Sequence, residues 1–253
     1  MINEKFAEGS SLLHRLDPRI KLIVSFIITF VTAIGINLMM LVQVFVLSIL
    51  LLLLAQLNIK SVCKQLFLVN FFIILIWFII PFTYPGESIF QLGHFIVYRE
   101  GIIYAAKITL RSNTIMLIII SLLSTSTISS LIHAMNNMYL SDKLIYLFFF
   151  VYRYLHVIKD EYDRIYNSML MRGFKPGSNI HTYKSYAYLI AMLLIKSYER
   201  SKKVYEAMLC RAFKGKFYII DNFSIKKIDI LFSALSFIVI LWFIIIEKGW
   251  III

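Results

Sequence analysis

The sequence predicts an all-α integral membrane protein with about five transmembrane helices and, between the fourth and the fifth, a long cytoplasmic region of amphipathic helices. The 253 residues are 60% hydrophobic and only 16% charged, and the mean hydropathy is +0.81, which excludes an ordinary soluble domain. Apolar runs recur at the length of roughly 20 residues that crosses about 30 Å of hydrocarbon. The charged residues gather in one segment, 124–227, where apolar residues recur at helical spacing.

Five apolar runs are candidate spans: 20–36, 38–57, 65–82, 102–123 and 229–250. The third is short and ends at Pro81. The first has no small-residue cleavage pattern and is therefore expected to be a retained span rather than a signal peptide. The predicted organisation is an N-terminal segment with four spans over 1–123, a cytoplasmic region over 124–227 and a last span over 228–253.

The fourth run carries Lys107 and Arg111, one helical turn apart. Charges inside a span are costly and usually face the bundle or the interface. We expect Lys107 to reach toward the interface and Arg111 to make a packing contact; a substrate contact is the alternative.

The distribution of charge predicts the orientation. Segment 124–227 holds 16 Lys and Arg against 7 Asp and Glu, which accounts for +9 of the net charge of +12. Because cations mark cytoplasmic connections, the N-terminus and this segment are predicted inside and the C-terminus outside, in the cell membrane. Acidic residues interleave with the basic ones, which argues against nucleic acid as a partner.

The polar residues offer no catalytic or metal site. The sequence contains no phosphate-binding loop and no hydrolase or zinc-protease motif. Its two cysteines are far apart, and its five histidines (His14, His94, His133, His156 and His181) lack metal-ligand spacing. Asp160, Glu161 and Asp163 could be read as a metal or acid/base cluster, but Asp160 and Asp163 lie beside Lys159 and Arg164 on the predicted helix and are expected to form local ion pairs. We therefore expect no catalytic residue, no bound metal and no cofactor.

Two long amphipathic helices are predicted inside the cytoplasmic region. The first covers 152–171, where Leu155, Ile158 and Tyr162 begin an apolar stripe, and it should stop before Gly173. The second covers about 183–213, with Gly215 as its stop. A shorter helix is predicted over 131–138.

The ends of these two helices carry nearly the same sequence. Met-Leu-Met-Arg-Gly-Phe-Lys at 169–175 returns as Met-Leu-Cys-Arg-Ala-Phe-Lys at 208–214, with five of seven residues identical. A cation in the last turn of a helix can simply offset the helix dipole, by about 0.3–1 kcal/mol. Dipole compensation accepts Lys as well as Arg and does not require the shared apolar flanks. The repeat therefore favours a duplicated docking contact, in which each guanidinium enters a groove on a partner protein.

Several stretches resemble one transporter family. They are Ser11-Leu-Leu-His-Arg-Leu-Asp-Pro-Arg-Ile-Lys-Leu22, Arg153-Tyr-Leu155 with Asp160-Glu161, Met171-Arg-Gly-Phe174 and Ser197-Tyr-Glu-Arg-Ser-Lys-Lys-Val-Tyr-Glu-Ala-Met-Leu209. Together they cover most of the chain and are similar to the transmembrane T component of energy-coupling-factor (ECF) transporters, most of all to the cobalt-type (CbiQ) subfamily. The resemblance implies two ABC ATPase subunits, a substrate-binding membrane S component and the lipid bilayer as partners, with ATP hydrolysis on the partner subunits.

In that family each of two coupling helices ends in an Ala-Arg-Gly-like triplet whose Arg sits in a groove on one ATPase. The matching triplets here, and the implied ATPase-docking residues, are Met171-Arg172-Gly173 and Cys210-Arg211-Ala212. Met171 and Cys210 replace the first Ala, and Ala212 replaces the final Gly, while the Arg is kept both times. We expect from Ala212 that the second helix end needs no left-handed residue at that position.

The resulting hypothesis is a non-catalytic coupling subunit of an ECF-type importer, with cobalt or nickel as the expected solute and a vitamin as the alternative. Two other classes are an integral-membrane enzyme acting on lipid or peptide, and a self-sufficient channel or carrier. The scarcity of unpartnered ionisable residues within the predicted spans counts against the channel.

Overall fold

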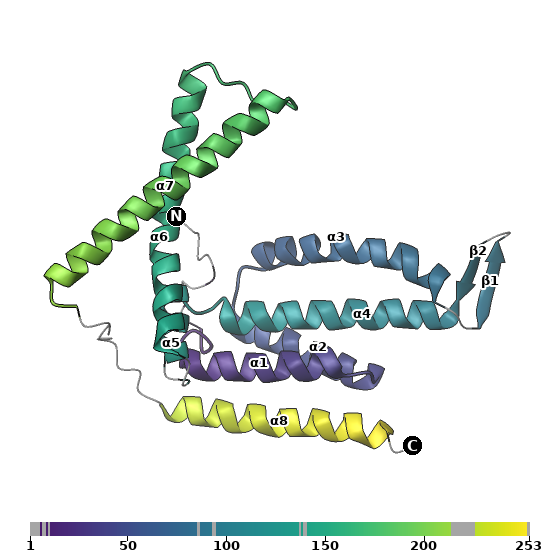
Figure 1. Ribbon diagram of the computed structural model, residues 1–253. Coiled ribbons are helices and arrows are strands. Elements are labelled where there is room, and N and C mark those ends of the chain that lie inside the picture. Colours follow the sequence, from purple (N-terminus) through teal and green to yellow (C-terminus); the bar gives the residue numbers. More distant parts are fainter. Residues whose placement is uncertain are drawn as a thin grey trace. The chain divides into compact units, whose positions relative to one another are not determined.

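The computed structural model describes residues 6, 9, 11–84, 87–92, 95–136, 138, 141–213 and 226–251. Its helices and strands run in the order α1 (Pro18–Ile34), α2 (Leu38–Ala55), α3 (Ile59–Thr83), β1 (Ser88–Leu92), β2 (Phe95–Tyr98), α4 (Arg99–Ile118), the π-helix η1 (Ile119–Leu123), α5 (Ile128–Asn136), α6 (Asp142–Met171), α7 (Ile180–Cys210) and α8 (Lys227–Ile251) (Figure 1). They divide into two compact units: α6 and α7 form one, and the remaining elements form the other.

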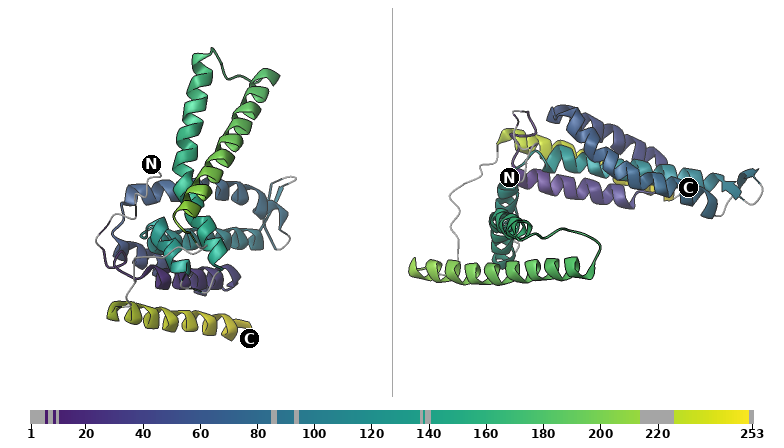
Figure 2. Two further views of the ribbon diagram at one scale, coloured as in Figure 1. Left: turned by 60° about the vertical axis from the view of Figure 1, so that its left-hand side comes forward. Right: turned by 90° about the horizontal axis from the view of Figure 1, so that it is seen from above.

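The larger unit is a bundle of apolar helices, which confirms the predicted all-α membrane fold. Four are long and apolar enough to cross a bilayer: α2, α3, α4 continued by η1, and α8, with mean hydropathies of 2.9, 2.5, 1.5 and 2.6. Helix α1 has 17 residues, at the lower end of the range that spans hydrocarbon. Helices α1, α3, α4 and α8 run roughly along one direction in each view (Figures 1 and 2).

The apolar centre of this unit lies where α1, α2, α8 and the end of α4 meet. Val24 and Ile28 of α1 pack there with Met40 and Val44 of α2, and with Ile118, Leu122, Ile240 and Phe243. A smaller cluster joins Val62, Leu117 and Ile120. The end of α4 and its π-helical continuation therefore contribute residues to both clusters.

Helix α3 is longer than the predicted span. It begins at Ile59, where the Asn58 side chain accepts a hydrogen bond from the Lys60 amide at 3.2 Å, and it continues past Pro81 to Thr83. Its main neighbour is α4. Polar side chains pair between the two helices: the Asn70 and Asn113 amides bond each other reciprocally at 3.1 and 3.0 Å, and Trp77 donates to Thr109 at 2.8 Å.

The connection between α3 and α4 forms a short antiparallel hairpin that the sequence analysis did not predict. Strands β1 and β2 pair with Ser88 opposite Tyr98 and Leu92 opposite Phe95. The hairpin leads directly into α4, where the Glu100 carboxylate accepts a hydrogen bond from the Glu87 amide at 2.7 Å. It is a minor addition to a helical fold.

The turn between α1 and α2 is held by one cation and one anion from other helices. Arg111 of α4 donates to the Gly35 carbonyl at 2.6 Å, and the Glu247 carboxylate of α8 accepts from the amides of Ile36 and Asn37 at 2.8 and 3.4 Å. The cation thus meets the carbonyl end of α1 and the anion meets the amide end of α2, which is the favourable arrangement for both helix dipoles. The predicted packing role of Arg111 is confirmed.

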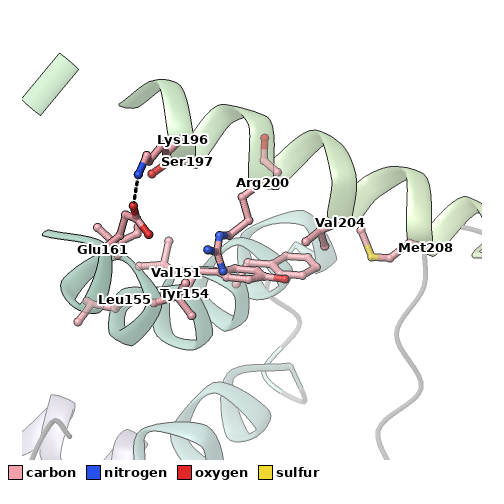
Figure 3. A pocket seen from close by; sticks show the side chains of 13 residues that line it. Val151, Tyr154, Leu155, Glu161, Lys196, Ser197, Arg200, Val204 and Met208 are labelled. Carbon is pink, nitrogen blue, oxygen red and sulfur yellow. Dashed lines mark hydrogen bonds and ion pairs between the residues drawn. The ribbon is translucent and has the colours of Figure 1, made fainter. Parts of the chain in front are cut away.

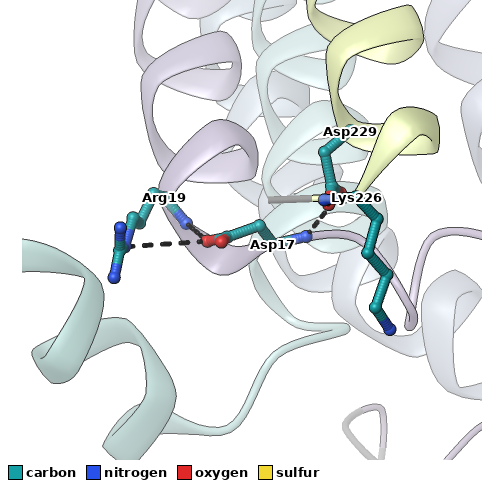
Figure 4. Close-up of polar contacts among 4 residues, drawn as sticks. All are labelled: Asp17, Arg19, Lys226 and Asp229. Carbon is teal, nitrogen blue, oxygen red and sulfur yellow. Dashed lines mark hydrogen bonds and ion pairs between the residues drawn. The ribbon is translucent and has the colours of Figure 1, made fainter. Parts of the chain in front are cut away.

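At the opposite end of the bundle, α1 and α8 begin side by side (Figure 4). The Asp229 carboxylate accepts hydrogen bonds from the amides of Asp17 and Lys226 at 2.9 and 2.8 Å, while Asp17 caps α1 by accepting from the Arg19 amide at 2.9 Å. Both acidic side chains are buried. One turn on, buried Lys21 donates to Ser126 at 2.8 Å and to Thr125 at 3.3 Å, and so joins α1 to the residues that follow η1.

The smaller unit contains the two long amphipathic helices, both of which begin earlier than predicted. Helix α6 has 30 residues and starts at Asp142, and α7 has 31 residues and starts at Ile180. They cross rather than lie along each other (Figure 1). Between them, Thr182 accepts a hydrogen bond from the Gly177 amide at 3.2 Å, and the Phe174 and Tyr186 rings meet edge to face with centroids 5.7 Å apart.

Candidate functional site

Helices α6 and α7 end in the same backbone motif. At the end of α6 the Gly173 amide donates to the Leu170 carbonyl at 2.9 Å and the Phe174 amide donates to the Met169 carbonyl at 3.1 Å. At the end of α7 the amides of Ala212 and Phe213 make the equivalent bonds to Leu209 and Met208, also at 2.9 and 3.1 Å. This pair of bonds defines a Schellman motif, which satisfies carbonyls that the last turn leaves unpaired.

The two arginines occupy equivalent positions in that motif. Arg172 and Arg211 are the residues directly after the last helical residue, with φ and ψ of −86° and 12° in the first and −95° and 19° in the second. The repeated sequence therefore corresponds to a repeated local structure.

The backbone conformation of Ala212 contradicts one expectation drawn from the sequence. Its φ is +57°, in the left-handed region, as is that of Gly173 at +81°. We expected that the exchange of Gly for Ala would remove the need for a left-handed residue at 212. Instead the two cap hydrogen bonds hold Ala212 in that conformation, although its Cβ makes it unfavourable by about 1–2 kcal/mol. Gly215, the expected stop of α7, lies outside the described residues.

Both helix ends are exposed. Arg172, Gly173, Cys210, Arg211 and Ala212 all lie on the surface, and the Met171 side chain is 90% exposed. The salt bridges among the described residues involve neither Arg172 nor Arg211. Each end thus presents a guanidinium beside exposed apolar side chains.

The crossing of the two helices is held by a charged contact that the sequence analysis missed. Glu161 of α6 accepts a hydrogen bond from Lys196 of α7 (Figure 3). The Glu161 carboxylate also lies 3.6 Å from the Arg164 guanidinium. Glu161 is buried, and the hydrogen bond from Lys196 lowers the pKa of its carboxyl. Local pairing was expected for Asp160 and Asp163, yet the ion pairs of the described residues include only Glu161 from this group.

Beside this contact the two helices enclose an apolar groove of about 500 Å³. Its lining includes Val151, Tyr154 and Leu155 of α6, and Val204 and Met208 of α7 (Figure 3). Many apolar and aromatic side chains of the two helices are exposed, among them Leu155 by 42%, Tyr198 by 72% and Tyr205 by 55%. The helices therefore touch at one crossing and leave most of their apolar surface uncovered within this unit.

The described histidines do not gather. His14 bonds the Ser11 side chain and the Phe6 carbonyl at 2.6 and 2.9 Å, and His133, His156 and His181 lie in three different helices. His94 lies outside the described residues. Within the part of the chain that is described, no three His, Cys, Asp or Glu side chains come together as metal ligands would.

Comparison with known proteins identifies the family. The family model described as "Cobalt transport protein" (CbiQ) matches residues 9–219, a range that includes both helix ends. The chain belongs to the CbiQ family. The resemblance of the sequence to the T component of ECF transporters is thereby confirmed.

Relatives with the same general name are similar along most of their length. "Energy-coupling factor transporter transmembrane protein EcfT" of Bacillus subtilis is 26% identical over 85% of each chain. The protein of that name from Leuconostoc gelidum is 29% identical over 97% of this chain and 96% of its own. The one from Ruminiclostridium cellulolyticum is 25% identical over 96% of both. The similarity thus covers the membrane helices as well as α6 and α7.

Proposed function

We propose that this chain is the membrane-embedded coupling subunit of an ECF-type importer. In this role it transmits the ATP-driven motion of two ABC ATPase subunits to a substrate-binding membrane subunit, and it hydrolyses no ATP itself. The observation that carries the proposal is the duplicated helix end: two exposed arginines in equivalent Schellman motifs within one repeated sequence. Two copies of one contact suit two ATPase subunits that offer the same groove.

The hydrogen bonding of the helix ends favours docking over capping. The carbonyls of Met169 and Leu170, and those of Met208 and Leu209, already accept bonds from the cap amides. The guanidinium of each arginine is therefore not required to satisfy them. A planar fork of donors beside apolar side chains suits a groove that is lined by carboxylates or carbonyls.

The proposed orientation places the N-terminus, α6 and α7 in the cytoplasm and the C-terminus outside, in the cell membrane. Its support is the excess of Lys and Arg in segment 124–227. Because ATP is cytoplasmic, the same orientation brings both helix ends to the side where ATPase subunits would bind.

The proposed solute is a cobalt or nickel ion. This choice of solute rests on the family model, which is described as a cobalt transport protein. A vitamin is the second candidate, because the relatives are named for ECF transport in general. Uptake of radiolabelled cobalt, nickel and vitamins by cells that express the whole complex separates the two.

Co-purification of the ATPase subunits tests the docking contact. Replacing Arg172 or Arg211 by Ala should weaken the complex by about 2–5 kcal/mol, the usual loss when one partner of a buried charged contact is removed. The double variant should lose it. Arg→Lys variants are the matched control, because Lys offsets a helix dipole as well as Arg but lacks its planar fork. If the Lys variants bind normally, or if the double Ala variant still transports, the docking role is refuted.

A further inference from the structure

A second groove lies within the larger unit, between α1, α2 and α8. It has a volume of about 330 Å³, and its lining is aliphatic and aromatic apart from one serine. Representative residues are Val24 and Ile28 of α1, Leu47 and Leu54 of α2, and Leu231 and Val239 of α8. We call it the α8 groove. The groove lies beside the contacts that α8 makes with α1 and α2.

The position and length of the groove match one leaflet of a bilayer. Along α8 it extends from Ile228 to Val239, about 16 Å at 1.5 Å per residue, while half of the hydrocarbon core is about 15 Å. It begins level with Leu12 and Leu13, just before α1. Because Val239 lies near the middle of α8, a bilayer crossed by α8 would place the groove within one leaflet.

The mouth of the groove is cationic. Arg15, Lys226 and Lys227 are exposed and lie within two residues of the lining residues Leu16 and Ile228 in the sequence. The side chain of Lys226 extends away from the Asp17–Asp229 contact (Figure 4). The nearby carboxylates of Asp17 and Asp229 are buried against backbone amides. None of the three cations takes part in the salt bridges of the described residues. An apolar groove beside cations that form no salt bridge among the described residues is complementary to an anionic amphiphile.

We propose that the α8 groove binds one anionic phospholipid, with an acyl chain between α1, α2 and α8 and its phosphate near Arg15, Lys226 and Lys227. A helix does not fit, because it is about 10 Å across with its side chains and the groove is too small for such a segment. A single hydrocarbon chain is narrower and needs only contacts of about 4 Å on each side. In the proposed orientation this lipid belongs to the cytoplasmic leaflet, where anionic lipids attract juxtamembrane cations. The inference is independent of ATPase docking.

Native mass spectrometry of the full chain in detergent tests the site. Dioleoyl phosphatidylglycerol and dioleoyl phosphatidylcholine, which have the same acyl chains, are added separately. We expect one retained phosphatidylglycerol, bound about tenfold more tightly than phosphatidylcholine, since each surface cation strengthens anionic-lipid binding. Equal retention of the two lipids would show annular lipid only and overturn the proposal.

Two pairs of variants separate the groove from its mouth. Leu231→Trp with Leu235→Trp should fill the groove and abolish the bound lipid, whereas Ile230→Trp with Ile238→Trp places the same bulk on exposed positions of α8 outside the groove. All four of the replaced residues are exposed, so both double variants should still fold. If both double variants lose the lipid equally, or neither does, the groove is not the site.

Variants of the three cations test the contact with the lipid phosphate without altering the residues that line the groove. Arg15, Lys226 and Lys227 are changed together to Gln, and the control changes Lys184, Lys202 and Lys203 of α7, which are equally exposed. The first triple variant should lose the preference for phosphatidylglycerol, and the control should keep it. A preference that survives in the first, or disappears in both, would refute the assigned mouth.

Discussion

Ala212 ends α7 in the same left-handed conformation in which Gly173 ends α6, with φ of +57° and +81°. Only one of these residues adopts that conformation without steric cost. The two ends of the repeat are therefore alike in shape but unlike in local stability.

The first prediction follows from this inequality. Ala212→Gly should stabilise the last turn of α7, and Gly173→Ala should destabilise that of α6, each by about 1 kcal/mol. Hydrogen–deuterium exchange of the amides at 212 and 213 should become about fivefold slower in the first variant. Ala191→Gly, in the middle of α7, is the control and should have the opposite effect, because Gly weakens a helix interior. Unchanged exchange in Ala212→Gly would show that residue 212 is not strained.

The second prediction concerns pH at the crossing of α6 and α7. The hydrogen bond from Lys196 lowers the pKa of the Glu161 carboxyl. A carboxyl with a lowered folded-state pKa stabilises the fold above its unfolded pKa, and the contribution disappears as the pH falls through the folded value. The crossing should therefore loosen only below about pH 4, since the unfolded pKa of Glu is about 4.3.

Distance distributions between spin labels at Asp163 and Glu199, which are exposed, would report this loosening in a background where Cys63 and Cys210 are replaced by Ser. Glu161→Gln should give a broad distribution that does not respond to pH. A crossing that stays narrow at pH 3 in the unaltered chain would contradict the role of the ion pair.

The third prediction concerns transmission of motion through α6 and α7. Tyr162→Pro or Lys203→Pro should kink the helix at a cost of about 3 kcal/mol or more, because proline lacks the amide and clashes one turn back. Within the reconstituted complex, ATP hydrolysis should persist while transport falls.

Ile180→Pro is the matched control for the helix kinks. Ile180 is the first residue of α7, and Asn179 before it is extended, with φ −122° and ψ 157°, as a residue preceding proline prefers. This variant should transport normally. Loss of hydrolysis together with transport in the kinked variants would indicate misfolding, and retention of both would show that the helices do not act as levers.

The fourth prediction concerns topology. With Cys63 and Cys210 replaced, a cysteine at Glu87 should react with a membrane-impermeant reagent only from outside, and one at Gly177 only from inside. Both positions are exposed, so access to the side chain does not limit the reaction. The reverse pattern would invert the proposed orientation and exclude docking of cytoplasmic ATPases at Arg172 and Arg211.

Features determined by local sequence were predictable. The apolar runs correspond to α2, α3, α4 and α8 because length and hydropathy alone decide whether a helix can span hydrocarbon. The end of α6 at Met171 followed from Gly173 and Pro176. The seven-residue repeat at 169–175 and 208–214 likewise predicted two similar helix ends, although it did not predict the left-handed conformation of Ala212.

Features that depend on distant residues were not predictable. Glu161 and Lys196 lie 35 positions apart, and nothing in the local pattern distinguishes Glu161 from Asp160 or Asp163. Nothing in the local sequence marks Lys21 as buried, yet it lies in the interior and donates to Thr125 and Ser126. The left-handed conformation of Ala212 was not predicted, because that region of φ and ψ normally favours Gly. In the structure the two cap hydrogen bonds hold Ala212 in it.

The contacts at the two ends of α8 have a mechanical consequence. Asp229 binds the start of α1, and Glu247 binds the turn between α1 and α2. Helix α8 is therefore held by polar contacts near both of its ends, and its residues from Ile228 to Val239 border the groove between them. Between these two polar contacts, Ile240 and Phe243 of α8 pack in the apolar cluster with residues of α1 and α2. An acyl chain could enter or leave the α8 groove by a small bending of α8, without the loss of either polar contact.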